Sequence, residues 1–507
     1  MLKISKELFT AWNEANLLYC HWKSNEHLLA GLEGETDLDV LLSCNNKEAG
    51  EEVLRRLDFL QCKSQFGSRY PDVDDWIGFD KDTGRLIHVH LHYGLVTGHK
   101  GMKEYSLLWT DKALCTRVLN VEYGIYTIEP NLEMVTLFTR IGLKADFRSI
   151  IRCRIGKFQF PKDVKKEIDW LKCRVDMKKI RLLLDSYYGD NADVMFELIK
   201  KDVLKSTDYL RLRKITESTF NKCSRVKSFM RIREVSFFAY QRFGKRIIQK
   251  IRPVISKKTP VSGKGISIAF IGQDGSGKST VTNEIKKWLT WKIEAERFYL
   301  GSGDHYNGYM KRLLRFSRQH IHINEQNNSK EKKAKEALNS VPYQKNKGLR
   351  RKIALVMTSV NFKNAAHHAY KTIQISSQYV KRGGIALFDR FPQNQFKGIY
   401  DGPKIINDAN NGLIRFVIRR LSNQEKMYID RIQNYQPTLV FKLQLPPEES
   451  IRRKPHENLE AVSRKAEITK ALRFDKSHVV ILDATQDYKE EILKVKRVIW
   501  SHLIDLQ

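Results

Sequence analysis

The pattern of apolar and polar positions changes its period along the chain and divides it into three parts. Residues 1–125 mix short helical stretches with strand-like runs such as TDLDVLL and GRLIHVHLHYGLV. From about 131 to 250, apolar residues recur every three or four positions with Lys and Arg between them, which predicts helices. From 266 to 507, strand and helix patterns alternate, which predicts an α/β fold with a parallel sheet.

Shorter segments refine this division. The opening residues, MLKISKELFTAWNEANLLY, mix charges with apolar positions and predict an amphipathic helix rather than a secretion signal. The turn-forming stretch FDKDTGR lies between two strand-like runs, so 76–94 is predicted to form a hairpin. The long, basic and polar stretch 305–352 is predicted to be an inserted helical or mobile segment.

Four parts follow from these patterns. We expect an α+β domain at 1–125 and a basic helical domain at 126–255. The polar segment SKKTPVSGKG at 256–265 carries Pro and Gly and is predicted to be a linker. The parallel-sheet domain is expected at 266–507.

Composition limits the class of protein. The 507 residues are 41% hydrophobic, so the chain can bury real cores. No run of about 18 apolar residues occurs, so no membrane-spanning helix is expected. The seven cysteines form no C-x-x-C pair, which argues against a zinc finger or a disulfide framework. Scattered thiols are typical of a reducing compartment, and we expect a cytoplasmic protein.

Charge is distributed unevenly along the chain. The net charge is +32 overall, with −7 over residues 1–139, +19 over 140–258 and +20 over 259–507. A basic body favours anionic partners such as nucleotides, nucleic acid, phosphorylated glycans or an anionic membrane surface. A solvated basic surface without a partner is the alternative, and the charge count leaves both open.

The segment GQDGSGKST at 272–280 fits the pattern G-x-x-x-x-G-K-[ST] between an apolar strand and an amphipathic helix. Glycines let backbone N–H groups surround phosphate oxygens, the Lys reaches the β and γ phosphates, and the hydroxyl binds Mg²⁺. The segment therefore predicts ATP and Mg²⁺ as cofactors. The residues expected to contact the nucleotide are Gly272, Gly275, Ser276, Gly277, Lys278, Ser279 and Thr280.

Two later segments carry charges that phosphoryl transfer needs. GGIALFDRFPQ ends an apolar run at Asp389, which we expect to help hold Mg²⁺, while Arg390 faces a phosphate. An ordinary strand ending in a surface ion pair is the alternative. After the strand PTLVFKLQL, a basic segment offers cations for a lid over the transferred group, or a solvated charge run: Arg452, Arg453, Lys454, Arg464 and Lys465.

Together these motifs resemble thymidylate kinases and related nucleoside monophosphate kinases over about 266–507. The resemblance implies a P-loop kinase fold, MgATP as donor, a nucleotide or nucleotide-like acceptor and, as in many relatives, a homodimer. It implies that Asp274 contacts the sugar of the acceptor, Arg390 holds its phosphate, and Arg452 or Arg453 serves the lid. The segment RFYLGSGDHYNG (297–308) lacks the Arg-Glu-Pro sequence of thymidylate kinases, so an acceptor other than dTMP stays open.

The first domain contains a second candidate site. Asp37 and Asp39 alternate along an apolar strand, so both carboxylates point to one side, as in two-metal sites. Ser24 lies on a turn before this strand, and the segment partially resembles the nucleotidyltransferase superfamily over about 18–95. His90 stands where that superfamily has a third carboxylate, with His88 and His92 on the same face. An active nucleotidyltransferase, a nucleotide- or sugar-phosphate-binding domain and a purely structural domain all stay open.

The segment 226–255 interleaves basic and apolar residues, which predicts an amphipathic helix that packs between domains or lies on an anionic membrane. The leading hypothesis is an ATP-dependent phosphotransferase fused to a nucleotidyltransferase-like domain. The alternative is a non-catalytic, nucleotide-dependent protein that docks on nucleic acid or membrane through its basic middle region. The absence of a zinc-finger, RNA-binding or helix-turn-helix signature in the sequence makes nucleic acid the less favoured partner.

Overall fold

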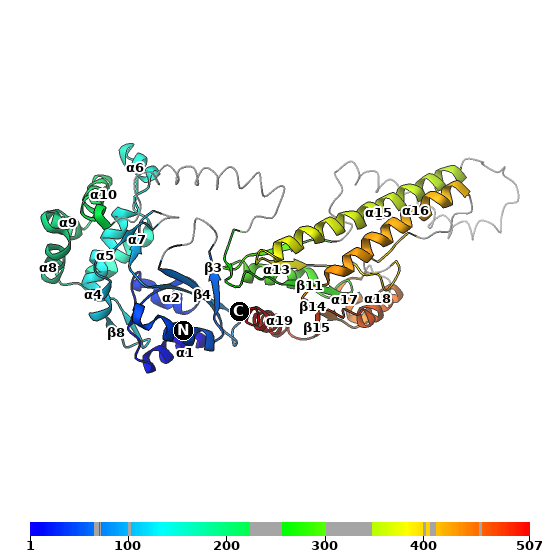
Figure 1. The fold of residues 1–507 in the computed structure, drawn as a ribbon, viewed down its shortest axis with the longest axis horizontal. Helices are drawn as coiled ribbons and strands as arrows, with labels where there is room; N and C mark the ends of the chain where they lie inside the picture. The colour runs from blue at the N-terminus through cyan, green and yellow to red at the C-terminus, as the bar shows by residue number, and fades with distance from the viewer. Residues whose placement is uncertain are drawn as a thin grey trace. The chain divides into compact units, whose positions relative to one another are not determined.

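A computed structural model of the chain divides it into two compact units. The first unit comprises residues 1–264 with 288–294 and 493–507, and the second comprises 265–287 and 295–492. Figure 1 shows the elements of both. The structure describes residues 1–64, 70, 72–99, 103–223, 256–300, 347–398, 402–405, 412–455 and 459–507.

An eight-stranded mixed sheet is the centre of the first unit, with the strand order β10-β3-β4-β5-β2-β1-β9-β8. The central strands β2 and β5 run parallel, whereas β4 and β5 are antiparallel and pair Phe79 with Leu86. The predicted hairpin at 76–94 is therefore confirmed. The strands are β1 Tyr19–His21, β2 Asp37–Leu42, β3 Leu60–Lys63, β4 Val73–Phe79, β5 Leu86–His92, β8 Val118–Asn120, β9 Ile125–Thr127 and β10 Thr259–Pro260. A small separate sheet pairs β6 Val96–Thr97 with β7 Tyr105–Ser106.

The two faces of this sheet differ in chemistry because successive side chains of a strand point to opposite sides. Leu38 and Val40 of β2 are fully buried in a core that includes Phe9 and Trp12 of α1. Helix α1, Lys3–Glu14, is the amphipathic helix predicted at the N-terminus. The alternate positions of β2 place its two aspartates on the other face of the sheet.

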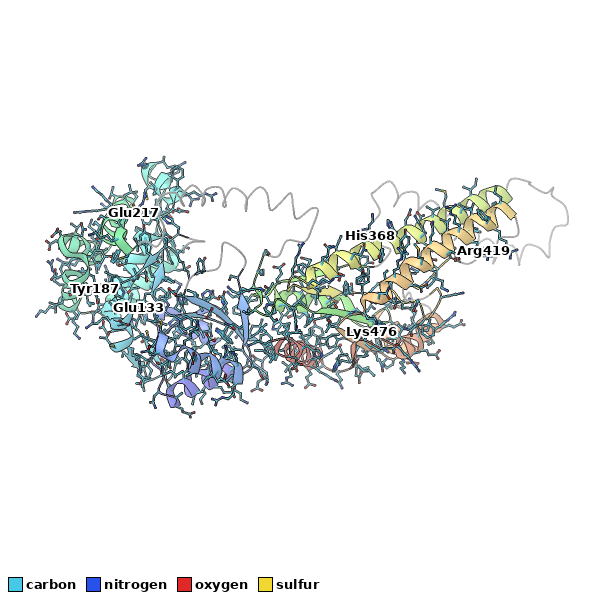
Figure 2. All side chains as sticks on the ribbon, in the orientation of Figure 1. Glu133, Tyr187, Glu217, His368, Arg419 and Lys476 are labelled. Atoms are coloured by element: carbon cyan, nitrogen blue, oxygen red, sulfur yellow. The ribbon has the colours of Figure 1, made fainter. Side chains whose placement is uncertain are left out.

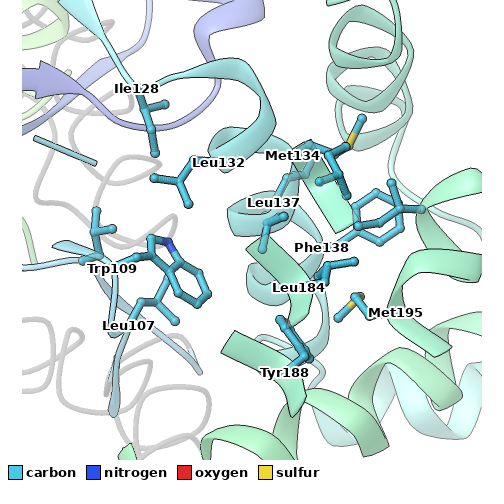
Figure 3. Packing of buried hydrophobic residues seen from close by; sticks show 14 of the residues in the cluster. Leu107, Trp109, Ile128, Leu132, Met134, Leu137, Phe138, Leu184, Tyr188 and Met195 are labelled. Atoms are coloured by element: carbon cyan, nitrogen blue, oxygen red, sulfur yellow. The ribbon is translucent and has the colours of Figure 1, made fainter. Parts of the chain in front are cut away.

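A run of helices from α5 to α10 follows strand β9 in the first unit. Helix α5, Pro130–Leu143, starts with Pro at its first turn, and the Glu129 carboxylate accepts a hydrogen bond from the Leu132 N–H at 3.0 Å. Figure 3 shows Phe138 of α5 packed among Leu184 and Met195 of later helices. The other helices are α2 Leu28–Leu32, α3 Lys47–Arg56, α4 Thr110–Cys115, α6 Phe147–Arg154, α7 Lys162–Lys172, α8 Met177–Tyr188, α9 Ala192–Lys200 and α10 Ser206–Phe220.

The segment after these helices departs from a simple linker. Thr259 and Pro260 form strand β10, which pairs antiparallel with Lys63 and Cys62 of β3. The stretch that we predicted as a linker at 256–265 thus contributes an edge strand to the first sheet. The predicted amphipathic segment 226–255 lies outside the described residues.

The second unit has a five-stranded parallel sheet in the order β12-β13-β11-β14-β15. This confirms the predicted α/β class with a parallel sheet after residue 266, whereas the nucleotidyltransferase-like character of the first unit stays a prediction. The strands are β11 Ser267–Gly272, β12 Ala295–Phe298, β13 Ile385–Phe388, β14 Leu439–Gln444 and β15 His478–Asp483.

The helices of the second unit include two long neighbours, α15 and α16, which carry His368 and Arg419 respectively in Figure 2. Residues 305–346 of the predicted insertion lie outside the described residues, and its last residues begin α15. The helices are α13 Lys278–Leu289, α15 Lys347–Val380, α16 Gly412–Ile432, α17 Pro447–Arg453, α18 Leu459–Ala471 and α19 Tyr488–Ile504, whose last turns belong to the first unit. Among the helices described, none combines the length and the apolarity needed to cross a bilayer.

The packing of Phe138 makes a stability prediction. Phe138 is 0% exposed, whereas Phe147, on the next helix, is 76% exposed. Phe138→Ala removes a fully packed ring, so we expect it to lower the free energy of unfolding by about 3–5 kcal/mol. The matched variant Phe147→Ala should change it by no more than about 0.5 kcal/mol. Scanning calorimetry of the full chain measures both, and equal effects of the two variants would contradict the packing described.

Candidate functional site

The glycine-rich loop lies between strand β11 and helix α13, where it opens at the carboxyl end of the parallel sheet. Gly275 and Gly277 have φ angles of +84° and +88°, which other residues adopt only with strain. A Cβ atom at Gly272 would lie 2.6 Å from the Leu443 carbonyl oxygen, so no larger residue fits there. Such a backbone is typical of loops whose N–H groups surround a phosphate.

Helix α17 supports this loop from one side. The Ser450 hydroxyl, fully buried, donates to the Asp274 carbonyl oxygen at 2.5 Å. The Arg453 guanidinium donates to the Gly275 carbonyl oxygen at 3.4 Å and to the Ala484 carbonyl oxygen at 3.0 Å. Sequence reasoning missed Ser450, because its partner lies 176 positions earlier in the chain.

Lys278 is the first residue of α13, and its ammonium is turned onto its own loop. The Nζ atom donates to the Gln273 carbonyl oxygen at 2.7 Å. Burial lowers the pKa of Lys278 to about 8, and the nearby charge of Arg390 acts in the same direction. The ammonium group of Lys278 is thus bonded to its own loop, and it would have to give up this bond to reach a phosphate oxygen.

Ser279 and Asp389 meet beside this loop. The Ser279 hydroxyl donates to Asp389 Oδ2 at 2.8 Å, and Arg297 of β12 pairs with the same carboxylate. Asp389 is 3% exposed, and its Oδ1 has no hydrogen-bond partner among the residues that the structure describes. A buried carboxylate oxygen without a partner, next to a hydroxyl, is the hard-oxygen environment that Mg²⁺ prefers. The residues present therefore fit a magnesium ion.

Arg297 was not among the residues expected at this site. It lies on strand β12, and its guanidinium also donates to Asn283 Oδ1 at 3.0 Å. In the sequence it opens the segment that departs from thymidylate kinases. The sequence signal was a cation at the end of a short strand-like run, but only the pairing of β12 with β13 places it beside Asp389.

A cavity of about 210 Å³ adjoins the loop and gathers the residues expected to hold an acceptor. Asp274, Lys278 and Arg390 line it, together with Lys404 and Lys465. Asp274 pairs with Lys465 of α18. Burial raises the pKa of Asp274, but the hydrogen bond and charge of Lys465 outweigh it and hold the pKa below its ordinary value. The cavity thus joins the loop to a cationic wall.

The two lid arginines lie differently. Both pair with Glu449 on the same helix, α17. The side chain of Arg452 is 79% exposed. The side chain of Arg453 is 39% exposed and also bonds to the loop. The structure brings Arg453 to the glycine-rich loop, and it shows no such contact for Arg452.

The second predicted site lies on the polar face of the sheet in the first unit. Asp37 and Asp39 of β2 lie opposite His88 and His90 of β5 in register. Asp39 Oδ1 lies 3.3 Å from His90 Nδ1. Asp75 of β4 was missed by sequence reasoning and bonds to both histidines at 3.1 Å. Asp75 lies on a different strand from the predicted residues, and only the pairing of β4 with β5 brings it next to the histidines.

Ser24, also predicted for this site, bonds to a carboxylate outside the group of aspartates and histidines. It adopts a left-handed conformation with φ of +58°, and its N–H donates to Glu167 Oε1 at 3.1 Å. The next N–H, of Asn25, donates to Glu133 Oε1 at 3.0 Å, and Glu133 is labelled in Figure 2. Burial raises the pKa of Glu133 to about 7. Carboxylates of helices α5 and α7 thus hold the turn.

Comparisons with known proteins find relatives for part of the chain. No protein-family model matches it. The Escherichia coli K12 protein described as "Uncharacterized ATP-binding protein YghR" is 24% identical over 233 residues, which cover 46% of this chain and 86% of that protein. The "Uncharacterized ATP-binding protein YghS" of the same strain is 26% identical over 249 residues, covering 46% and 93%.

Solved structures also align with the chain at 14% identity. A deoxyadenosine kinase from M. mycoides with bound dATP aligns over 46% of this chain and 98% of its own, with a TM-score of 0.25. The crystal structure of APE1195 aligns over 48% and 98%, with a TM-score of 0.20. Both Escherichia coli relatives are described as ATP-binding proteins, and nearly half of this chain is similar to them in sequence.

Proposed function

We propose that the second unit transfers a phosphoryl group from ATP to a small phosphorylated acceptor, a nucleotide or nucleotide-like molecule. One observation carries the proposal: a single cavity of about 210 Å³ is lined by Lys278 of the glycine-rich loop and by Asp274 and Arg390. Donor and acceptor phosphates need such a shared cationic space, because the reaction is catalysed mainly by positioning and charge. The descriptions of the Escherichia coli relatives support ATP as the donor.

The donor side follows from the contacts of the loop. Lys278 exchanges its bond to the Gln273 carbonyl for a phosphate oxygen of ATP, which is a stronger, charge-assisted bond. Ser279 and Asp389 are the residues that would hold Mg²⁺, which neutralises charge on the phosphates when bound. Arg453, which bonds to the loop at Gly275, is the lid arginine assigned to the transferred group.

The acceptor side follows from the cationic wall of the cavity. Arg390 holds the acceptor phosphate, because a guanidinium binds phosphate oxygens in a two-pronged fashion. Asp274 accepts a hydrogen bond from an acceptor hydroxyl in exchange for its pairing with Lys465. The acceptor is therefore a molecule that carries both a phosphate and a free hydroxyl.

The alternative of a non-catalytic, nucleotide-dependent binder rests on the segment 226–255, which lies outside the described residues. No contact of the described residues favours it. ATP consumption that a small acceptor stimulates would support the enzyme. Binding to DNA or RNA that weakens steeply with salt would support the alternative.

The first prediction concerns Lys278. Lys278→Ala removes the charge that the loop offers to the phosphates, so we expect phosphoryl transfer to fall by about 10²–10³-fold. Lys287→Ala, on the exposed side of the same helix, is the matched control and should keep wild-type rates. Transfer of the γ-phosphate from labelled ATP to a panel of nucleoside monophosphates and sugar phosphates measures both. Undiminished turnover in Lys278→Ala would contradict the kinase proposal.

The lowered pKa of Lys278 makes a second prediction. The ammonium is charged below its pKa of about 8, and only the charged form attracts phosphate. The dissociation constant of ATP should therefore be constant at neutral pH and rise by up to about tenfold per pH unit above pH 8. Lys278→Arg keeps its charge throughout, because a guanidinium stays protonated in this range. Isothermal titration should find that the dissociation constant of ATP rises above pH 8 in the wild type but not in Lys278→Arg. The same rise in both proteins would show that it does not come from the titration of Lys278.

A third prediction separates acceptor from donor. Arg390→Ala should raise the acceptor KM and lower kcat by at least about tenfold each, because the contact to the acceptor phosphate serves both states. The affinity for ATP should stay within about twofold, since Arg390 is assigned to the acceptor. Arg382→Ala, in the turn before β13 and at the other end of that strand, is the control. A collapse of ATP affinity in Arg390→Ala would reassign Arg390 to the donor site.

A further inference from the structure

The polar face of the first sheet carries a cluster of nitrogen and oxygen atoms that the proposed kinase function does not use. Asp39 of β2 and His90 of β5 are opposite each other in the parallel register, and His92 follows on the same face. Ligand atoms of these three residues lie within 4.8 Å of one another. His92 is fully buried, and the side chains of Asp39 and His90 are mostly buried.

The separations within this group suit a metal ion. His90 Nδ1 lies 3.3 Å and His92 Nε2 lies 3.2 Å from Asp39 Oδ1. Ligands at about 2.0–2.2 Å from a tetrahedral ion lie about 3.3–3.6 Å apart. Two of the three separations are therefore close to those of ligands on one tetrahedral ion, and the ligand nitrogens of His90 and His92 lie within 4.8 Å of each other.

Asp75 orients His90 as an outer carboxylate orients a metal ligand. The Asp75 Oδ1 atom lies 3.1 Å from His90 Nε2, which leaves His90 Nδ1 directed toward Asp39. Histidines that bind metals almost always donate their other ring N–H to such a group. Among the described residues, His88 belongs to this outer layer, since its two nitrogens bond to Asp37 at 2.8 Å and to Asp75 at 3.1 Å.

Lysines pair with the carboxylates of this group. Lys23 Nζ lies 2.7 Å from Asp39 Oδ1, and Lys258 Nζ lies 2.9 Å from Asp75 Oδ1. A carboxylate has two oxygens with several acceptor sites, so Asp39 can hold both an ion and Lys23. Lys103 also interacts electrostatically with Asp39, and its charge would favour an anionic fourth ligand on a bound ion.

We propose that Asp39, His90 and His92 bind a divalent first-row transition metal ion, of which Zn²⁺ is the test case. Two imidazoles and one carboxylate are a recurrent ligand set for such ions, whereas Mg²⁺ prefers oxygen ligands. The site belongs to the first unit and is independent of phosphoryl transfer in the second. It also differs from an all-carboxylate two-metal site, because nitrogen supplies two of its three ligands.

X-ray absorption of the wild-type chain with one equivalent of Zn²⁺ tests the ligands without any substitution. We expect nitrogen and oxygen neighbours at about 2.0–2.2 Å. The seven cysteines offer a competing site, and thiolate ligands would appear at about 2.3 Å. A sulfur shell, or no uptake of Zn²⁺ by the full chain in equilibrium dialysis, would overturn the proposal.

Variants of the full chain then assign the residues by stoichiometry. Asp39→Asn and His92→Gln should each remove one bound equivalent, or weaken its binding by at least about 100-fold. Asp75→Asn should keep the equivalent and weaken it by about 10–100-fold, as an outer carboxylate does. His27→Gln changes a partly exposed histidine of the same unit and should bind Zn²⁺ as the wild type does. Unchanged binding in Asp39→Asn and His92→Gln would overturn the assignment even if Zn²⁺ binds elsewhere.

Discussion

A charge removed from water must be compensated by other charges or hydrogen bonds, and both units are organised around this requirement. In the second unit, Asp389 is buried with Ser279 and Arg297 as its partners. In the first unit, the Asp39 carboxylate is held by Lys23 and by the histidines of β5. Burial raises the pKa of that carboxyl, but these neighbours outweigh it and lower the pKa well below its ordinary value. In both units, the compensating groups come from segments that are distant in the sequence.

The two sites reach this arrangement by different routes. In the second unit, the conformation of the backbone places the side chains of the site. Glycines with positive φ shape the loop, and the parallel strands all end at the same side of the sheet. In the first unit, the pairing of neighbouring strands places aspartates opposite histidines across the sheet face. Precise positions therefore depend on local turn chemistry in one case and on strand register in the other.

Sequence patterns predict the features that lie within one continuous segment. The hairpin at 76–94 and the glycine-rich loop with its flanking strand and helix are both encoded in short stretches. Asp37 and Asp39 are placed on one face by their spacing of two alone. Each of these predictions needs only neighbours in sequence.

Contacts between distant segments could not be predicted in this way. Asp75 joins the first site because β4 pairs with β5, and Arg297 joins the second because β12 pairs with β13. Lys465 pairs with Asp274 across 191 positions. The period of a strand shows which side chains share a face, but it does not name the strand that pairs with it. Only the three-dimensional fold supplies that partner.

The pairing of β10 with β3 has a consequence for how the chain is made. Lys63 and Cys62 on one side, and Thr259 and Pro260 on the other, are nearly two hundred residues apart. At a synthesis rate of about 5–20 residues per second, β10 is synthesised about 10–40 s after β3. The edge of β3 has no pairing strand from β10 during this time. An uncovered strand edge can pair with a strand of another chain. The two-residue strand β10 pairs poorly with other chains, because it is short and its proline has no N–H to donate. The completed edge is thus safer from aggregation than the nascent one.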